Sequence, residues 1–169
     1  MWMLNTQLLI IISSLFALTC TADESRYIVT YVYDGDTVRL HPINAFGQEN
    51  DIKLRITQID APERNQAYGL VARRALIKLC QANGVVATTE ILAQDKYQRS
   101  LGWLQCNQVD ASLYLVKQGL AWHDERYSHD REIEQAQEQA KAQKLGLWAD
   151  IKPMAPWVWR KLHKVKFYS

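Results

Sequence analysis

The strand pattern near the beginning of the chain restricts the fold more than any other feature. Residues 26–33 are rich in β-branched and aromatic side chains, and residues 36–41 continue that pattern after an Asp-Gly dipeptide, which is typical of a hairpin turn. Between residues 51 and 59 apolar and polar side chains alternate, which favours a third strand with one buried face. Pro62 ends this strand because proline has no N–H to donate to a neighbouring strand.

The rest of the chain adds helices and two more strands. Helical segments are indicated by apolar side chains at helical spacing, by Asp110 at a capping position and by glycines that follow the segments. The expected helices cover residues 67–82, 111–118 and 129–145, and the expected fourth and fifth strands cover residues 85–93 and 100–106. This order predicts an α+β fold that is mainly β: a five-stranded OB-fold barrel with three helices packed on it.

The two ends of the chain are expected to lie outside this domain. Residues 1–22 contain no Lys, Arg, Asp or Glu, and their apolar centre of about eleven residues is shorter than the roughly 20 that span a bilayer. This length fits a secretory signal peptide, so we expect an exported protein, periplasmic or secreted, with no stable membrane association once the signal is cleaved. Residues 23–150 would form the domain, and residues 151–169 a basic, tryptophan-containing, irregular arm.

Cysteine and histidine spacing gives weaker indications. Cys20 would leave with the signal, and the remaining Cys80 and Cys106 fit either a disulfide or two separate buried thiols. Spacings of the CxxC kind that bind zinc are absent from the sequence. His123 and His129 have no other clustered ligands nearby, so we expect surface histidines there rather than a zinc site.

Acids and arginines gather at the ends of the expected strands. They are Asp34 and Asp36 in the hairpin, Arg55, Asp60 and Glu63 around the third strand, and Asp95 and Arg99 between the fourth and fifth. Calcium binds carboxylate and carbonyl oxygens, and the planar guanidinium of arginine holds two phosphate oxygens together. The formal charge of the whole chain is only +2, so a polyanion would have to be bound by such a local cluster.

Several separated motifs are similar to one known family. The segments "YDGDTVRL", "LRITQIDAPE", "DKYQRSLGWL", "LVKQGLAW" and "AQKLGLWAD", in this order, resemble the staphylococcal-nuclease (thermonuclease) family from about Tyr27 to Asp150. The resemblance implies an OB-fold barrel and calcium-dependent cleavage of DNA and RNA. In this family hydrolysis occurs at the P–O5′ bond and leaves 3′-phosphate ends.

Position by position, the resemblance implies a calcium site and three catalytic side chains. Asp36 and Asp60 would supply the calcium carboxylates, with the backbone carbonyl of Ala61, where threonine is common in the family. Asp34 is expected to serve only the hairpin turn. The carboxylate that activates water would be Glu63, and the arginines that hold the scissile phosphate would be Arg55 and Arg99.

Nucleotide-contacting positions are matched in part. Lys96, Tyr97 and Tyr127 agree with the family pattern, whereas Glu125 stands where tyrosine is common. In the arm, Arg160 and its basic neighbours near Trp157 and Trp159 would either grip nucleic acid or be pinned to the domain by the tryptophans.

We therefore expect a monomeric, calcium-dependent endonuclease that acts on DNA and RNA. The alternative is a catalytically inactive OB-fold module that only binds nucleic acid. Such a module would be expected to have lost some of the acids or arginines, and this chain retains all five charged catalytic positions.

Overall fold

A small barrel begins with the expected hairpin in the computed structural model, which describes residues 26–163. The expected signal peptide lies outside the described residues, as do residues 164–169 of the arm. The strands are β1 (Arg26–Val32), β2 (Thr37–Pro42), β3 (Ile52–Ile56), β4 (Ile59–Asp60), β5 (Ala87–Thr88), β6 (Ile91–Gln94), β7 (Ser100–Gly102), β8 (Gln105–Cys106), β9 (Val109–Asp110) and β10 (Trp122–His123). The helices are α1 (Gly69–Cys80), α2 (Ala111–Lys117), α3 (Arg131–Ala142) and α4 (Pro156–Leu162), with 3₁₀ turns η1 (Gln48–Asn50) and η2 (Gly146–Ala149).

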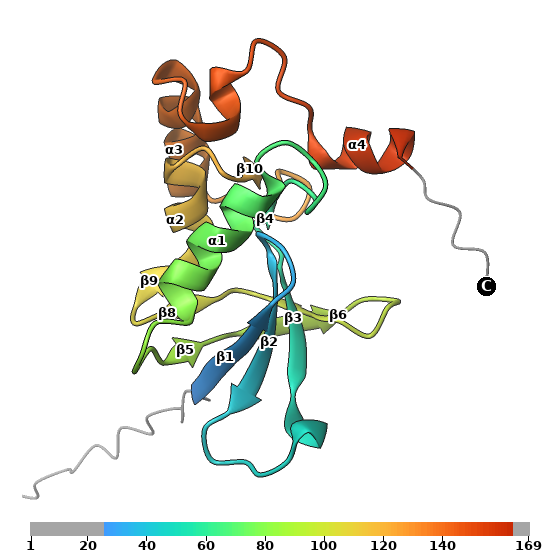
Figure 1. The fold of residues 1–169 in the computed structure, drawn as a ribbon, viewed down its shortest axis with the longest axis vertical. Helices are drawn as coiled ribbons and strands as arrows, with labels where there is room; N and C mark the ends of the chain where they lie inside the picture. The colour runs from blue at the N-terminus through green and yellow to red at the C-terminus, as the bar shows by residue number, and fades with distance from the viewer. Residues whose placement is uncertain (1–25, 164–169) are drawn as a thin grey trace, which may run out of the picture.

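The strand pairings form a ring of five strands. β1 is antiparallel to β2 and β2 to β3, and β3 runs parallel to β7, which is antiparallel to β6. β5 pairs with both β1 and β8. Because β5 and β6 follow each other closely in the chain, as do β7 and β8, each pair acts as one bent strand and the pairings close into a ring. Figure 1 shows the resulting strong curl of the sheet. The α+β OB-fold prediction is confirmed.

The expected fourth and fifth strands are each broken in the middle. The expected fourth strand consists of β5, which pairs with β1, and β6, which pairs with β7. The chain must therefore bend between Thr88 and Ile91. At this corner a Cβ on Gly102 would lie only 2.1 Å from the carbonyl oxygen of Glu90. Glycine therefore allows the two bent strands to cross closely, and a small barrel requires such strong coiling.

Three helices pack on the barrel as predicted, with somewhat shorter bounds. Helix α1 buries Ala72, Leu76 and Cys80, which lie four residues apart on one face. The side chain of Asp110 caps α2 by accepting a hydrogen bond from the N–H of Leu113 at 2.8 Å. Within residues 26–163 no helix has the length and apolar character needed to cross a membrane.

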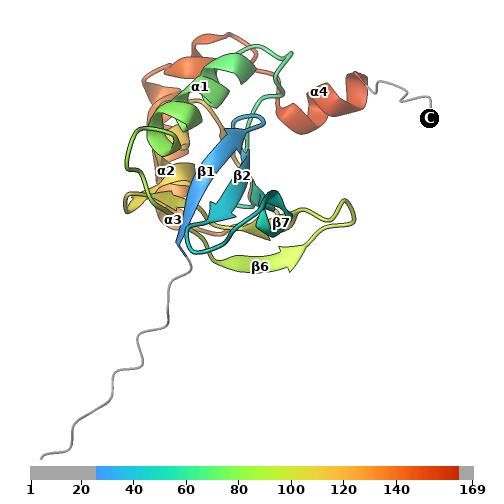
Figure 2. The ribbon, with the colours of Figure 1, turned by 60° about the horizontal axis from the view of Figure 1, so that its bottom comes forward.

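The C-terminal arm differs from the expectation of an irregular segment. Residues Pro156–Leu162 form the helix α4, because proline is well suited to the first turn of a helix and the residues that follow have no helix breaker. Figures 1 and 2 show α4 projecting from the body of the fold, on the same side as the turn between β6 and β7.

The tip of the first hairpin also differs in detail from the two-residue turn that Asp-Gly suggested. The connection spans residues 33–36, and the N–H of Tyr33 donates to the carbonyl of Thr37 at 2.8 Å. A Cβ on Gly35 would lie 2.6 Å from the Cβ of Ala61 and 2.8 Å from that of Ala72. The glycine is thus required for close packing of the hairpin tip against the end of β4 and helix α1.

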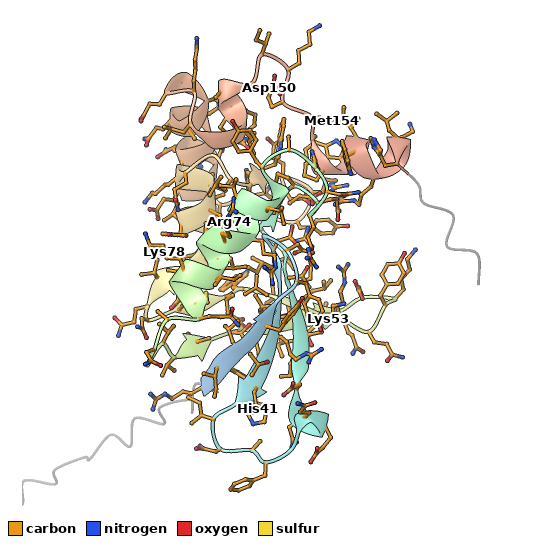
Figure 3. The ribbon with its side chains drawn as sticks, viewed as in Figure 1. His41, Lys53, Arg74, Lys78, Asp150 and Met154 are labelled. Carbon is orange, nitrogen blue, oxygen red and sulfur yellow. A yellow bond between two sulfur atoms is a disulfide. The ribbon has the colours of Figure 1, made fainter. Side chains whose placement is uncertain are left out.

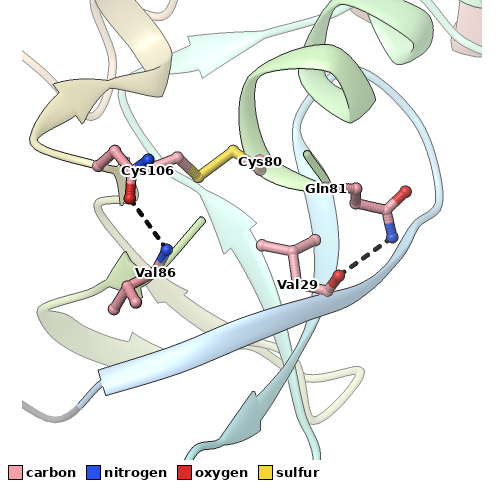
Figure 4. Close-up of a disulfide and its surroundings, with 6 residues drawn as sticks. Val29, Cys80, Gln81, Val86 and Cys106 are labelled. Carbon is pink, nitrogen blue, oxygen red and sulfur yellow. Dashed lines mark hydrogen bonds between the residues drawn. A yellow bond between two sulfur atoms is a disulfide. The ribbon is translucent and has the colours of Figure 1, made fainter. Parts of the chain in front are cut away.

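A disulfide joins Cys80 at the end of α1 to Cys106 in β8 (Figure 4), with the two Cα atoms 5.2 Å apart. Next to it, the side-chain amide of Gln81 donates to the carbonyl of Val29 in β1 at 3.1 Å. Of the two readings that the sequence left open, the structure contains the disulfide. It ties the helix layer to the barrel wall.

Candidate active site

A pocket of about 430 Å³ opens between the barrel end, the β6–β7 turn and α4. It brings together all five charged residues that the sequence predicted to be catalytic or metal-binding. Its lining consists of Asp34, Asp36, Thr37, Arg55, Thr57, Asp60, Ala61, Glu63, Asp95, Tyr97, Arg99, Leu101, Asp124, Arg126, Tyr127 and Arg160.

Asp36 is a buried carboxylate at the start of β2. Its Oδ2 accepts a hydrogen bond from the N–H of Ala61 at 2.7 Å, and its Oδ1 accepts one from the hydroxyl of Thr37 at 3.0 Å. Burial raises the pKa of Asp36 well above its usual value, although the nearby positive charge of Arg55 opposes this. Asp34 takes the role in the turn that was expected, because its Oδ1 accepts from the N–H of Asp36 at 3.0 Å.

Arg55 links the two predicted calcium carboxylates. Its Nε lies 3.1 Å from Asp36 Oδ1, and its Nη2 lies 3.2 Å from Asp60 Oδ1. The guanidinium also donates to the carbonyl oxygens of Ile56 and, at 2.8 Å, Ile59. Arg55 lies on β3, at the position paired with Thr37, so the sheet register itself places it beside Asp36.

Asp60 is completely buried in β4, a two-residue strand that pairs with β10. Glu63 follows after Pro62, in the loop that leads to α1, and its side chain is 34% exposed. The loop turns tightly here: Gln66 exchanges hydrogen bonds with Glu63, and a Cβ on Gly69 would lie 1.8 Å from the carbonyl oxygen of Glu63. Backbone packing against the start of α1 thus fixes the position of Glu63.

Arg99 comes from the β6–β7 turn, which Asp95 organises. The Asp95 carboxylate accepts from the N–H groups of Tyr97 and Arg99 at 2.9 Å each, and its Oδ2 lies 2.8 Å from both Nε and Nη2 of Arg99. Burial pushes the pKa of Asp95 upward, but these hydrogen bonds outweigh it and leave the pKa below its usual value. The ionised Asp95 therefore holds Arg99 at the edge of the pocket.

The predicted substrate-binding residues are only partly gathered. Tyr97 and Tyr127 line the pocket and are 69% and 68% exposed, so two aromatic rings are available at its rim. Lys96 is exposed on the turn, with its Nζ 5.1 Å from the ring centre of Tyr97, and it is not among the lining residues. Glu125 is also exposed, and its neighbour Arg126 lines the pocket.

Two further lining residues, Asp124 and Arg126, were not singled out from the sequence, and a third, Arg160, was expected either to grip nucleic acid or to be pinned to the domain with the arm. Asp124 is buried and forms a bidentate ion pair with Arg126: Nε and Nη2 of the arginine each lie 2.8 Å from one oxygen of the carboxylate. Arg126 also lies 3.8 Å from Asp60. Arg160 of α4 reaches Asp60 and Glu63 across about a hundred residues of sequence, a proximity that no local pattern could reveal.

His123 corrects another expectation. It was expected at the surface, but it is only 5% exposed, because β10 pairs with β4 inside the fold. Its two ring nitrogens have no hydrogen-bond partner within the described part of the chain. His129 is exposed, and no zinc-like arrangement is present at either histidine in residues 26–163.

The donor set fits the calcium ion that the motifs imply, although residues 26–163 contain no preformed cluster of three or more acidic, histidine or cysteine ligands. Asp36, Asp60 and the carbonyl group of Ala61 offer the hard oxygen ligands that calcium prefers. The pocket lining contains six acids and four arginines, so it has a formal excess of two negative charges. One divalent cation would neutralise this excess and stabilise the buried carboxylate of Asp36.

Comparison with known proteins agrees with this geometry. The family model described as "Staphylococcal nuclease homologue" matches residues 53–150. The chain belongs to this family. An "Uncharacterized endonuclease" of Haemophilus influenzae is 37% identical over 163 residues, which cover 96% of this chain and 86% of the relative. A similarly named protein of Escherichia coli O157:H7 is 32% identical over 78% of this chain and 82% of the relative. A "Micrococcal nuclease" of Shigella flexneri is 31% identical over 80% of each chain.

Membership of the staphylococcal nuclease family confirms the resemblance drawn from the motifs, and with it the nuclease class of hydrolase. The family match begins at Lys53 and therefore includes Arg55, Asp60, Glu63 and Arg99. The roles of individual residues remain predictions that rest on the motifs and on the pocket.

Proposed function

We propose that this protein is an exported, calcium-dependent endonuclease that hydrolyses DNA and RNA at the P–O5′ bond and leaves 3′-phosphate ends. The observation that carries the proposal is one pocket in which Asp36 and Asp60 lie beside Glu63, Arg55 and Arg99. A module that had lost catalysis would not be expected to keep this complete set, which disfavours the binding-only alternative.

The side chains of the pocket suit in-line attack of water on a phosphodiester. Glu63, which is partly exposed, would orient the water and accept its proton on the carboxylate as the new P–O bond forms. Arg55 and Arg99 would donate to the non-bridging phosphate oxygens, where negative charge builds as the water attacks, and the departing O5′ would take up a proton from the solvent. Calcium, held by Asp36, Asp60 and the Ala61 carbonyl, would supply charge neutralisation at the phosphate.

The rim of the pocket would hold the nucleic acid chain with little regard to sequence. Tyr97 and Tyr127 expose their rings, and stacking on an aromatic ring is open to every base. Lys96 on the same turn would contribute charge toward the phosphate backbone. We infer that double-stranded DNA must open locally, so single-stranded substrates should be cleaved faster.

The test is a digest by the purified chain of single-stranded DNA, double-stranded DNA and RNA, side by side, with calcium and with a chelator. We expect calcium-dependent cleavage of all three and 3′-phosphate ends on the products. Intact substrates in the presence of calcium, with the fold verified by circular dichroism, would favour the binding-only module. Export is tested separately, by cell fractionation and by sequencing the N-terminus of the mature protein.

Arg99→Gln tests the predicted role of one arginine within the same assay. Loss of one preorganised donor to a developing charge typically lowers the rate by about 10²–10³-fold, and the fold should be retained because Arg99 lies on an exposed turn. The matched control is Arg74→Gln on the outer face of α1 (Figure 3), which should leave the rate unchanged. A wild-type rate in Arg99→Gln would remove this arginine from the site.

A further inference from the structure

Arg160 of α4 occupies the carboxylates on which the proposed calcium site depends. Its Nη2 lies 2.6 Å from Asp60 Oδ2, and its Nη1 lies 3.0 Å from Asp60 Oδ1 and 2.9 Å from Glu63 Oε1. The planar guanidinium thus contacts both oxygens of Asp60 and also bridges to Glu63. The Asp60 side chain is only 1% exposed, so Arg160 must enter the pocket to form this ion pair.

A calcium ion and Arg160 compete for the same oxygen atoms. Calcium sits about 2.3–2.6 Å from each ligand oxygen. Arg160 already holds a nitrogen at 2.6 Å from Asp60 Oδ2, while Asp60 Oδ1 accepts from both Arg55 and Arg160. A cation bound to Asp60 would therefore meet the guanidinium at very short range, where two positive charges repel strongly.

Most of helix α4 is exposed to solvent, and its contacts with the body are few. Pro156 is its one buried residue, whereas Trp157, Val158 and Leu162 are 38%, 40% and 65% exposed. Besides Arg160, the ring of Trp157 contacts the body: it packs edge-on against Trp122 with ring centres 5.3 Å apart, and the Arg126 guanidinium lies 5.6 Å from its centre. Trp159 lines a second cavity together with residues of the body. This cavity of about 210 Å³ lies between residues 150–159 and the loop that precedes α1, so part of this segment is not packed directly against the body.

We propose that α4 is a cation-responsive strap: Arg160 holds Asp60 and Glu63, and binding of a divalent cation displaces Arg160 and releases α4 from the pocket. The proposal rests on the calcium site of the proposed function. It predicts that Arg160 weakens calcium binding and blocks the pocket at low calcium. Figures 1 and 2 show α4 projecting to one side of the barrel, away from the other helices.

The first test measures calcium affinity by calorimetry, without nucleic acid, in the wild type, Arg160→Gln and Lys161→Gln. Removing the competing guanidinium should tighten calcium binding by about ten-fold or more in Arg160→Gln. Lys161 is exposed at the next position of the same helix, so Lys161→Gln removes an equal charge and should bind calcium as the wild type does. Unchanged or weaker binding in Arg160→Gln would overturn the proposal, as would an equal gain in both variants.

The second test needs no change at Arg160. The indole N–H of Trp157, assigned by comparison with Trp157→Phe, should shift in NMR spectra of the wild type as calcium is added, because α4 leaves Trp122. An indole signal that does not respond at saturating calcium would overturn the strap.

The two tests separate the strap from the proposed function. Calcium-dependent cleavage with no effect of Arg160 on calcium affinity would leave the nuclease proposal standing and remove the strap. Tighter calcium binding in Arg160→Gln without cleavage of any substrate would support the strap and contradict the nuclease proposal. If neither the wild type nor Arg160→Gln binds calcium, both proposals are wrong.

Discussion

At the scale of single residues, the site is a set of buried charges that compensate one another. Asp36 and Asp60 are 5% and 0% exposed, and a buried carboxylate is costly unless it is paired. Arg55 contacts both, which offsets part of the cost and leaves Asp36 with a raised pKa. We infer that a divalent cation, once it displaces Arg160 from Asp60, would remove part of the remaining cost.

A second charged pair, away from the pocket, gives a prediction for pH. His41 lies at the end of β2 far from the helices (Figure 3), with Nδ1 2.7 Å from Asp51 Oδ1 and Nε2 3.1 Å from the carbonyl oxygen of Ala45. Both ring nitrogens thus face acceptors. The hydrogen bond to Asp51 is the main cause of the raised pKa of His41, because it favours the imidazolium form.

The sign of the effect on stability follows from this shift. The stabilisation by the pair is complete below the pKa of an unfolded histidine, about 6.5, and is lost as pH rises through the higher pKa of the folded state. We expect the melting temperature of the wild type to exceed that of Asp51→Asn most near pH 6, and the difference to shrink above pH 8. A difference that grows with pH would contradict the assignment.

At the scale of elements, short segments position the site more than long ones do. Asp60 sits in a two-residue strand, and its neighbour in the ladder is Trp122 of the equally short β10. The hairpin tip carries Asp36 and reaches the end of β4 because Gly35 has no side chain to separate it from Ala61 and Ala72. Backbone contact between these elements therefore sets the distance between the two aspartates.

Gly35→Ala tests this packing. The new Cβ would overlap two alanine Cβ atoms that move only with their backbones, so we expect a loss of about 1–3 kcal/mol in the free energy of unfolding and weaker calcium-dependent cleavage. Gly84→Ala is the control: it has open space around it but a φ of +75°, so it should cost about 1 kcal/mol through backbone strain alone and leave cleavage unchanged. Equal effects of both variants on cleavage would argue against the role of Gly35.

At the scale of the whole molecule, the barrel and the helix layer form one body around a continuous core. That core runs from Val32 and Leu54 in the barrel through Leu76 of α1 to Leu115 of α2 and Ile133 of α3. The Cys80–Cys106 disulfide adds a covalent link between the two layers across 26 residues of sequence. The site lies where both layers meet, so its geometry depends on their being held together.

Reduction of the disulfide should therefore lower stability without changing the fold. A link of this loop length typically contributes about 2–4 kcal/mol. We expect urea denaturation of the wild type to show a lower midpoint with dithiothreitol, whereas a Cys80→Ser, Cys106→Ser double variant should have the same lower midpoint with or without it. If dithiothreitol does not change the urea midpoint of the wild type, the bond does not form in solution. Two reactive thiols in the unreduced protein would show the same.

The sequence by itself determined the barrel, the three helices packed on it and the five charged residues of the site. It could do so because strand alternation, the Asp110 cap and the spaced family motifs are local patterns, each readable within about ten residues of chain. Only the tertiary structure decided that Arg126 and Arg160 enter the pocket, that Gly35 serves packing rather than a two-residue turn, and that His123 is buried. The physical reason is that these facts depend on contacts between segments far apart in the chain. Arg160 and Asp60 are separated by 100 residues, and a local sequence pattern does not predict which distant residues come into contact.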